Sequence, residues 1–451
     1  MTLTTHGDIC YITQQFVAKK KFIEMKAEYK KRVVDEILDF YLESMGAVLI
    51  EGPKWCGKTR TGEEHAKSVV KLQDPDNVDK YRAAIKAKPS ILLEGPTPRL
   101  IDEWQDFPIL WNAVRHLVDE RGEDGQFILT GSAVPCEGQK DNTPPRHTGT
   151  GRIVRMRMRP MSLWESGEST GEISLSALFD GAGEVSGRSS IGVDEIAHLV
   201  CRGGWPQAVL AKTPRAAYMK SSSYVDEVVH EDVHRVDGVE RNPDRVRNLL
   251  KSLARNISTM ATNETILQDL KANDSSISEK TLSSYLNALR KIFLVEDVPA
   301  WSPSLKSRLA IRSAMKRQFV DPSVATAVLG ATPRRLLNDF RSFGSFFESL
   351  CVRDVRVYAQ TLDGEVRHYR DQTGLEADMI VALKDGRWGA IEVKLGAGDI
   401  DSAAEGLKKL RAKVDVGRMG HPSFLMILTG TDLGYTRDDG VVVCPLGCLR
   451  P

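Results

Sequence analysis

The sequence has no paired cysteine pattern, no long apolar run and no excess of charge of either sign. Its 7 cysteines are scattered and odd in number, so neither a disulfide framework nor a zinc site is indicated. No run of about 18 or more apolar residues occurs, and the first residues lack the apolar segment of a secretory signal. We therefore expect a soluble, cytoplasmic protein with reduced thiols and no membrane partner.

The overall charge gives no general attraction to nucleic acid. Lysine and arginine number 62 and aspartate and glutamate 61, for a formal net charge of +1. Binding to DNA or RNA would therefore depend on local basic patches. With 451 residues, the chain is also too long for one hydrophobic core, and several domains are expected.

Strands and helices alternate in the first third of the chain. Short apolar segments predict strands at 47–52, 90–95, 99–102 and 126–133. A helical stretch is expected at 57–72, after the first strand, and an amphipathic helix precedes the last one. This alternation predicts a parallel sheet with crossover helices.

The remaining two thirds change character along the chain. Residues 135–151 and 166–190 are rich in Pro, Gly, Ser or Glu and predict surface loops near domain boundaries. Residues 194–295 have helical periodicity almost throughout. From about residue 341 the pattern predicts a helix followed by hairpin-like strands.

The segment GPKWCGKT fits the pattern G-x-x-x-x-G-K-[ST], directly after an apolar strand and at the start of a helix. In this pattern the backbone N–H groups surround the β-phosphate, Lys58 reaches the β and γ oxygens, and the Thr59 hydroxyl binds Mg²⁺. The sequence therefore predicts ATP and Mg²⁺ as cofactors. The residues expected to bind them are Gly52, Pro53, Lys54, Trp55, Cys56, Gly57, Lys58 and Thr59.

Two carboxylates follow a later strand, in the segment LIDE. Asp102 is suited to hold Mg²⁺ through water, and Glu103 to orient or deprotonate the attacking water. The next strand ends in FILTGSA, where Thr130 or Ser132 could contact the γ-phosphate or the water. A strand often ends in such small polar residues without any catalytic role, and the sequence leaves both interpretations open.

These motifs resemble a family of AAA+-type P-loop ATPases of bacteria and archaea whose C-terminal part is a domain of unknown function. The resemblance rests on LIEGPKWCGKT, LIDEWQDFP, FILTGSA and GRIVRMRMRPMSLWE, and continues through GGWPQAV, YVDEVVHEDV and FFESL to AIEVK, over about residues 45–400. It implies ATP hydrolysis. It also implies an arginine finger that acts on a neighbouring subunit, and hence self-association, with Arg152 at the matching position and Arg146 as the alternative.

The middle of the chain suggests a DNA-binding module. Residues 264–298 predict a helix, a turn, a second helix and a strand, which is the layout of a winged helix-turn-helix. A basic stretch follows, in which Lys306, Arg308, Arg312, Lys316 and Arg317 could contact phosphates. DNA is expected rather than RNA, although winged helices also dock proteins and such charges can simply face solvent.

Four residues near the C-terminus suggest a second site. Glu392 and Lys394 lie two apart on a predicted strand and so share a face. With Glu348 on a helix and Asp378 on a strand they resemble the E…D…ExK site of PD-(D/E)XK nucleases. The resemblance implies Mg²⁺ on Glu348, Asp378 and Glu392 and hydrolysis assisted by Lys394. Asp378 can share that face only if the connecting loop is bulged or odd in length; a scaffold without cleavage is the alternative.

Together these patterns predict an α/β protein with a P-loop NTPase parallel sheet, a helical and winged-helix middle and a C-terminal restriction-endonuclease-like domain. The expected function is ATP hydrolysis that drives a switch engaging DNA. The alternatives are an ATP-gated Mg-dependent nuclease and a non-catalytic adaptor that docks a protein. The expected parts are a basic N-terminal extension (1–32), the ATPase domain (33–165), a loop and helical lid (166–240), a winged-helix-like domain (241–340) and a nuclease-like domain (341–451).

Overall fold

The computed structural model describes residues 29–133, 148–302 and 314–451. The chain divides into two units, Met1–Lys31 and Arg32–Pro451, and the description below concerns the second. Nearly all of the predicted basic extension, together with Arg146, Lys306, Arg308 and Arg312, lies outside the described residues.

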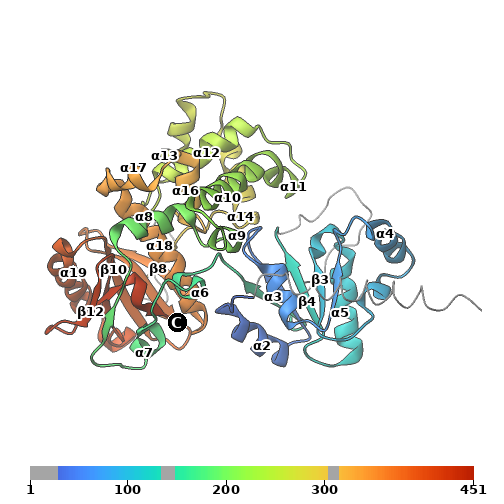
Figure 1. Cartoon of the computed structure of the whole chain (residues 1–451), viewed down its shortest axis with the longest axis horizontal. Helices are drawn as coiled ribbons and strands as arrows, with labels where there is room; N and C mark the ends of the chain where they lie inside the picture. The colour runs from blue at the N-terminus through green and yellow to red at the C-terminus, as the bar shows by residue number, and fades with distance from the viewer. Residues whose placement is uncertain (1–28, 134–147, 303–313) are drawn as a thin grey trace, which may run out of the picture. The chain divides into compact units, whose positions relative to one another are not determined.

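The first part of this unit is a five-stranded sheet in which every strand runs parallel, as predicted (Figure 1). Its order is β2-β3-β4-β1-β5, so β4 lies between β1 and β3. The strands are β1 (Ala47–Glu51), β2 (Ser68–Lys71), β3 (Arg99–Asp102), β4 (Phe127–Gly131) and β5 (Ile153–Arg157). The helices are α2 (Val34–Ser44), α3 (Lys58–His65), α4 (Val78–Ala87) and α5 (Ile109–Arg121).

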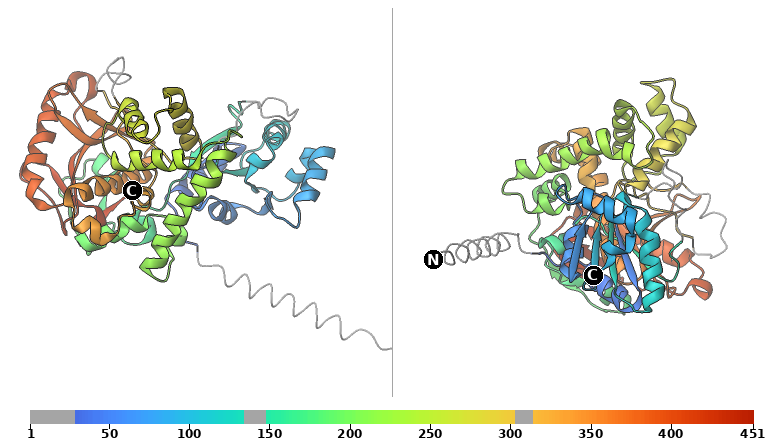
Figure 2. Two further views of the ribbon diagram at one scale, coloured as in Figure 1. Left: turned by 90° about the horizontal axis from the view of Figure 1, so that it is seen from above. Right: turned by 90° about the vertical axis from the view of Figure 1, so that its right-hand side faces the viewer.

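Helices cover both faces of this sheet (Figure 2). Successive residues of β1 enter different hydrophobic clusters, Val48 one and Leu49 the other, because side chains alternate across a strand. A strand buried on both faces must be apolar throughout, which is why AVLI was recognisable from the sequence.

Two expectations for this part were wrong. The strand predicted at 90–95 is a 3₁₀ turn, Pro89–Leu93, which begins at proline and buries Leu92 and Leu93. The helix after the P-loop ends at His65, and residues 68–71, expected to be helical, form β2. The adjacent β-branched residues Val69 and Val70 favour the extended conformation there.

The segment 166–190 does not form the expected surface loop. It contains β6 (Ile173–Ser174), α7 (Leu175–Phe179) and β7 (Ser186–Arg188). Strand β7 pairs with β12, at the edge of the C-terminal sheet, and β6 pairs with β14. The chain thus adds strands to the C-terminal part before it enters the helical region.

Residues 194–295 are mainly helical, which confirms the prediction from their periodicity. A π-helical segment, Val228–Asp232, continues α10. The backbone after α14 pairs antiparallel with the segment that precedes α16, through Val298 and Lys316. The helices are α8 (Val193–Arg202), α9 (Pro206–Val209), α10 (Pro214–Glu227), α11 (Val233–Arg235), α12 (Pro243–Arg255), α13 (Asn263–Lys271), α14 (Glu279–Lys291), α16 (Pro322–Leu329) and α17 (Pro333–Leu337).

The C-terminal part is a seven-stranded mixed sheet of order β7-β12-β13-β11-β10-β9-β8. Strands β8, β9 and β10 form an antiparallel meander, and β11 joins β10 in parallel. Its strands are β8 (Gly364–Arg370), β9 (Glu376–Leu383), β10 (Trp388–Lys394), β11 (Leu425–Thr429), β12 (Leu433–Thr436) and β13 (Val442–Pro445). The remaining elements are α18 (Phe340–Gln360), α19 (Ile400–Lys413), α20 (Val416–Met419) and β14 (Leu449–Arg450).

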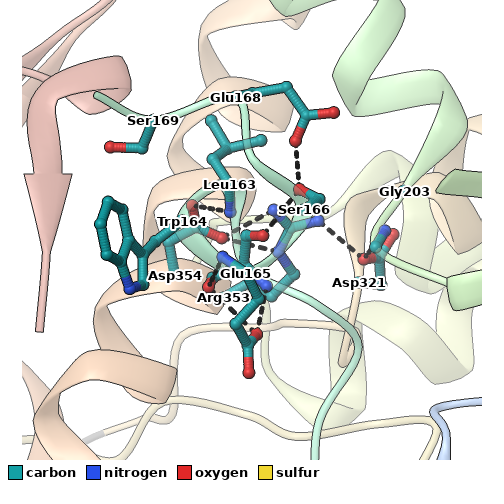
Figure 3. Close-up of polar contacts among 12 residues, drawn as sticks. Leu163, Trp164, Glu165, Ser166, Glu168, Ser169, Gly203, Asp321, Arg353 and Asp354 are labelled. Carbon is teal, nitrogen blue, oxygen red and sulfur yellow. Dashed lines mark hydrogen bonds and ion pairs between the residues drawn. The ribbon is translucent and has the colours of Figure 1, made fainter. Parts of the chain in front are cut away.

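A buried polar junction connects distant segments of the chain (Figure 3). The Arg353 guanidinium on α18 lies 3.0 Å from Asp321, which caps α16, and 2.7 Å from Asp354. Asp354 in turn accepts a hydrogen bond of 3.0 Å from the backbone N–H of Leu163, at the start of α6 (Leu163–Ser166). Because buried charges are costly unless paired, this junction fixes how α6, α16 and α18 meet.

Candidate functional site

The predicted phosphate-binding loop connects β1 to α3. Gly57 has φ of +108°, a conformation that favours glycine. A Cβ added to Gly52 would lie 2.1 Å from the Met158 carbonyl oxygen, so that position also requires glycine. The loop therefore brings backbone N–H groups to the start of α3, where the partial positive charge of a helix favours an anion.

Lys58 and Thr59 begin α3 and point to different partners. Lys58 is buried, and its Nζ donates to the Pro53 carbonyl oxygen at 2.8 Å. The Thr59 hydroxyl donates to Asp102 Oδ1 at 2.8 Å. The structure thus brings together the two predicted Mg²⁺ ligands, which are 43 residues apart in the sequence.

Asp102 lies at the end of β3 and makes a second hydrogen bond. Thr130, on the intervening strand β4, donates to Asp102 Oδ1 at 2.6 Å and accepts from the Glu103 backbone N–H at 3.0 Å. Burial raises the pKa of Asp102. A hydroxyl and a carboxylate side by side are suitable oxygen ligands for Mg²⁺, which proteins usually bind through few side chains together with phosphate.

Glu103 has the left-handed backbone conformation, with φ of +56°. Such strain costs about 1–3 kcal/mol and occurs often at functional sites. Its carboxylate accepts hydrogen bonds from the Ser132 hydroxyl at 2.8 Å and from Gln105. Both residues considered from the FILTGSA motif therefore contact the acidic pair, Thr130 at Asp102 and Ser132 at Glu103.

Two side chains of the helical region, Asp232 and Arg235, face the P-loop, and nothing in the sequence indicated this. Lys54 forms an ion pair with Asp232, which lies 178 residues away on the π-helical segment. Both line a cavity of about 340 Å³, together with Arg235. Its lining residues are Lys54, Gln73, Gln105, Asp106, Ser132, Ala133, Tyr224, Asp232, Arg235, Val236 and Ile292.

Arg152 lies at the end of the strands where β1 and β5 begin, whereas the P-loop lies at the end where β1 stops. It precedes β5, whose first residue Ile153 pairs with Ala47, the first residue of β1, whereas the P-loop follows the last residue of β1. Its Nε donates to Asp119 Oδ1 at 2.7 Å. Arg152 therefore cannot reach the nucleotide site of its own chain, and its role as a finger on a neighbouring subunit stays a prediction.

Two of the three carboxylates predicted near the C-terminus, Asp378 and Glu392, share one face of the sheet, and Glu348 lies on α18. Leu383 N–H donates to the Arg387 carbonyl oxygen, which leaves a loop of three residues, 384–386. The register Ile391↔Met379 then places Asp378 beside Glu392. The odd loop length that the arrangement required is confirmed, whereas the nuclease resemblance itself stays a prediction.

A lysine from the predicted basic stretch lies among these carboxylates. Lys316 Nζ is 2.6 Å from Glu348 Oε1 and 2.9 Å from Asp378 Oδ1. Burial raises the pKa of Glu348 to about 8. The next residue, Arg317, is also buried and pairs with Asp297 at 3.1 Å. The expectation that Lys316 and Arg317 contact DNA phosphates is therefore wrong, because both already have internal partners.

The parallel sheet, the P-loop and the acidic pair define an AAA-type P-loop ATPase domain. Three family models match the chain in turn: an AAA domain over residues 44–166, a domain of unknown function (DUF8612) over 193–335 and a domain of unknown function (DUF4143) over 343–449. The first supports ATPase activity in general, and the other two indicate no function.

Similar proteins add little about function. Uncharacterized proteins of Mycobacterium bovis and Mycobacterium tuberculosis are each 23% identical over 351 residues, 77% of this chain and 70% of theirs. The Walker-type ATPase of Pyrococcus abyssi is 14% identical, covering 67% of this chain and 99% of its own, with a TM-score of 0.41. The replication initiator DnaA bound to AMPPCP and single-stranded DNA is 14% identical over 57% of this chain and 86% of its own, with a TM-score of 0.27. These scores are too low to establish a common fold.

Among the described residues, none of the helices combines the length and apolar character that crossing a membrane requires. Within the same residues, no group of three or more His, Cys, Asp or Glu side chains is arranged to hold a metal ion.

Proposed function

We propose that this protein binds ATP with Mg²⁺, hydrolyses it, and uses the change of bound nucleotide to alter its helical region. One observation carries the proposal: the Thr59 hydroxyl of the P-loop is hydrogen-bonded to Asp102 at 2.8 Å, directly beside Glu103. Binding alone would need only the loop, whereas hydrolysis also needs a group that positions water.

Each side chain has a role that its position allows. Lys58 starts α3, from where its ammonium can reach the β and γ phosphates. Thr59 and Asp102 would hold Mg²⁺, which when bound offsets the negative charge of the phosphates. Glu103, held by Ser132, would orient or deprotonate the attacking water. Thr130 is a positioning residue, because it holds Asp102 and the Glu103 backbone.

The ion pair between Lys54 and Asp232 supports a switch. Lys54 belongs to the P-loop, and Asp232 is the last residue of the π-helical segment that connects α10 to α11. π-Segments inside helices are frequent at functional sites. An incoming triphosphate would compete with Asp232 for the Lys54 ammonium, so nucleotide binding would loosen this link to the helical region.

Replacement of Asp232 should therefore strengthen nucleotide binding. We expect Asp232→Asn to lower the Kd for ATP about 5-fold, or about 1 kcal/mol, because it frees Lys54 and removes an anion from the cavity. Titration with a fluorescent ATP analogue would measure this. Asp226→Asn is the matched control, since Asp226 pairs with Arg247 at the surface. Equal affinities for both variants would contradict a nucleotide-sensitive link.

The proposed switch engages DNA through its helical region. Helices α13 and α14, followed by the antiparallel pairing of Val298 with Lys316, have the layout of a winged helix-turn-helix. Along α14, Lys280, Ser283 and Asn287 are exposed and share one face. Small polar and basic side chains at the start of such a helix suit contacts with bases and phosphates.

Turnover of ATP with and without polymer tests both parts. We expect Mg²⁺-dependent phosphate release without polymer, and a several-fold increase with double-stranded DNA but not with RNA. Lys280→Glu should remove the increase and keep the basal rate, because it reverses a charge at the exposed end of α14. Lys409→Glu, an exposed change on α19, is the control.

The outcomes of this experiment separate the alternatives. A basal rate equal to that of Lys58→Ala would contradict hydrolysis. A normal basal rate without any response to DNA would contradict only DNA engagement, and would favour an adaptor that docks a protein. Cleavage of DNA by the C-terminal part stays a prediction, which the position of Lys316 disfavours.

A further inference from the structure

The carboxylates of the C-terminal site already surround a cation. Lys316 enters from the helical region, and its Nζ donates to Glu348 Oε1 at 2.6 Å and Asp378 Oδ1 at 2.9 Å. Its side chain is 11% exposed, against 14% for Glu348 and 15% for Asp378. An ammonium at such a depth is stable only because it is paired.

The remaining oxygen atom of Asp378 is also engaged. The Val393 backbone N–H donates to Asp378 Oδ2 at 2.9 Å. Both oxygens of this carboxylate thus accept hydrogen bonds from the protein itself. On the other side of the site, Lys394 Nζ lies 3.3 Å from Glu392 Oε2. Two ammonium groups therefore lie among the three carboxyl groups, and burial raises the pKa of two of these, Glu348 to about 8 and Glu392 to about 9.

The backbone fixes the position of Lys316. Its N–H donates to the Val298 carbonyl oxygen at 2.9 Å, and the Val298 N–H donates back at 2.8 Å. Arg317, the next residue, donates from Nε to the Ala261 carbonyl oxygen at 2.8 Å. Because the backbone of Lys316 and the side chain of Arg317 both make hydrogen bonds, the fold itself places the Lys316 ammonium among the carboxylates.

These contacts do not fit a divalent cation. Mg²⁺ needs a nearly octahedral shell of oxygen atoms at about 2.1 Å, and a cation at the centre of these carboxylates would have to displace the Lys316 ammonium. Within the described part of the chain, no three or more His, Cys, Asp or Glu side chains are grouped so that they could hold a metal ion. The arrangement that the sequence suggested as a metal site is therefore filled by the protein.

We propose that Lys316 is a built-in counter-ion that replaces the divalent cation among Glu348, Asp378 and Glu392. The C-terminal site then binds no metal and cleaves no phosphodiester while Lys316 is in place. Instead, it ties the helical region to the C-terminal sheet through a buried ion pair. This proposal is independent of the function proposed above, because it involves no residue of the nucleotide site.

Divalent-cation binding in the absence of nucleotide tests the proposal. The melting temperature of the full chain would be compared with EDTA and with Mn²⁺. We expect no cation-dependent change for the wild type and a rise of about 3 °C or more for Lys316→Met at about 1 mM Mn²⁺, because the freed carboxylates can then bind the ion. The nucleotide site should not contribute, because without nucleotide it lacks the phosphates that complete the shell of the cation.

Two further variants keep the test decisive. Lys316→Met leaves buried carboxylates unpaired and could unfold, so Lys316→Met/Glu348→Gln, which also removes one carboxylate, should be folded and respond to Mn²⁺ in the same way. Lys384→Met, at an exposed lysine paired with Asp363, is the matched control and should not respond.

Either of two results would overturn the proposal. One is a Mn²⁺-dependent rise in the wild type that Asp378→Asn abolishes, since the ion would then bind with Lys316 in place. The other is a folded Lys316 variant without any response, since the lysine would then not be occupying a cation site.

Discussion

Lys58→Ala should abolish detectable ATP binding. Lys58 occupies the first position of α3, directly after the glycine that ends the loop. From there its ammonium can bond both the β and the γ phosphates. A hydrogen bond to a charged group is worth about 1.5–3 kcal/mol and each 1.4 kcal/mol is tenfold in affinity, so the loss of two such bonds corresponds to about 100-fold or more.

The measurement is a titration with ATP and Mg²⁺ by calorimetry. Lys80→Ala, at an exposed lysine on α4 of the same domain, should bind as the wild type does. Lys58→Ala should stay folded, because among the residues that the structure describes the Lys58 ammonium donates only to the Pro53 carbonyl oxygen. Thermal unfolding without nucleotide would establish this. Equal affinity of Lys58→Ala and the wild type would refute the assignment of the phosphate site.

The nucleotide site could be predicted because most of its signal is local. A strand, a glycine loop and a helix start lie within 47–59, and each has a distinct residue pattern. The acidic pair follows an apolar strand in the same way. What the sequence could not give is the place of β4 between β1 and β3, which brings Thr130 to Asp102.

The contacts that were missed join residues far apart in the chain. Asp232 meets Lys54 across 178 residues, and Lys316 meets Asp378 across 62. A charged side chain has the same local pattern whether it faces solvent or a buried partner. The stretch around Lys316 therefore suggested a surface for phosphate, although the fold buries that lysine against carboxylates.

Pairing between distant strands also explains why the strand at 186–188 was predicted to be part of a loop. Strand β7 is only three residues long, and its ends are polar. It is a strand because β12 pairs with it, and no periodicity in SGR could indicate this. By contrast, the loop between β9 and β10 was constrained by a geometric argument, since only a loop of odd length or one with a bulge lets Asp378 and Glu392 share a face.

Glu103→Gln should separate ATP binding from hydrolysis. The change keeps the size of the side chain and leaves an oxygen that can accept the hydrogen bond from Ser132, now 2.8 Å from Glu103 Oε2. Binding should persist, because Lys58, Thr59 and Asp102 are unchanged. Turnover should fall by about 10²–10⁴-fold, the usual contribution of a general base.

Single-turnover and steady-state phosphate release, together with the Kd for ATP, would measure the two effects. Glu64→Gln on α3, where Glu64 makes an exposed ion pair with Arg60, is the matched control and should retain full activity. If Glu103→Gln hydrolysed ATP within about twofold of the wild type, water activation would have to be assigned to another group. If binding were lost together with turnover, Glu103 would instead be holding the nucleotide site together, through its contacts with Ser132 and Gln105.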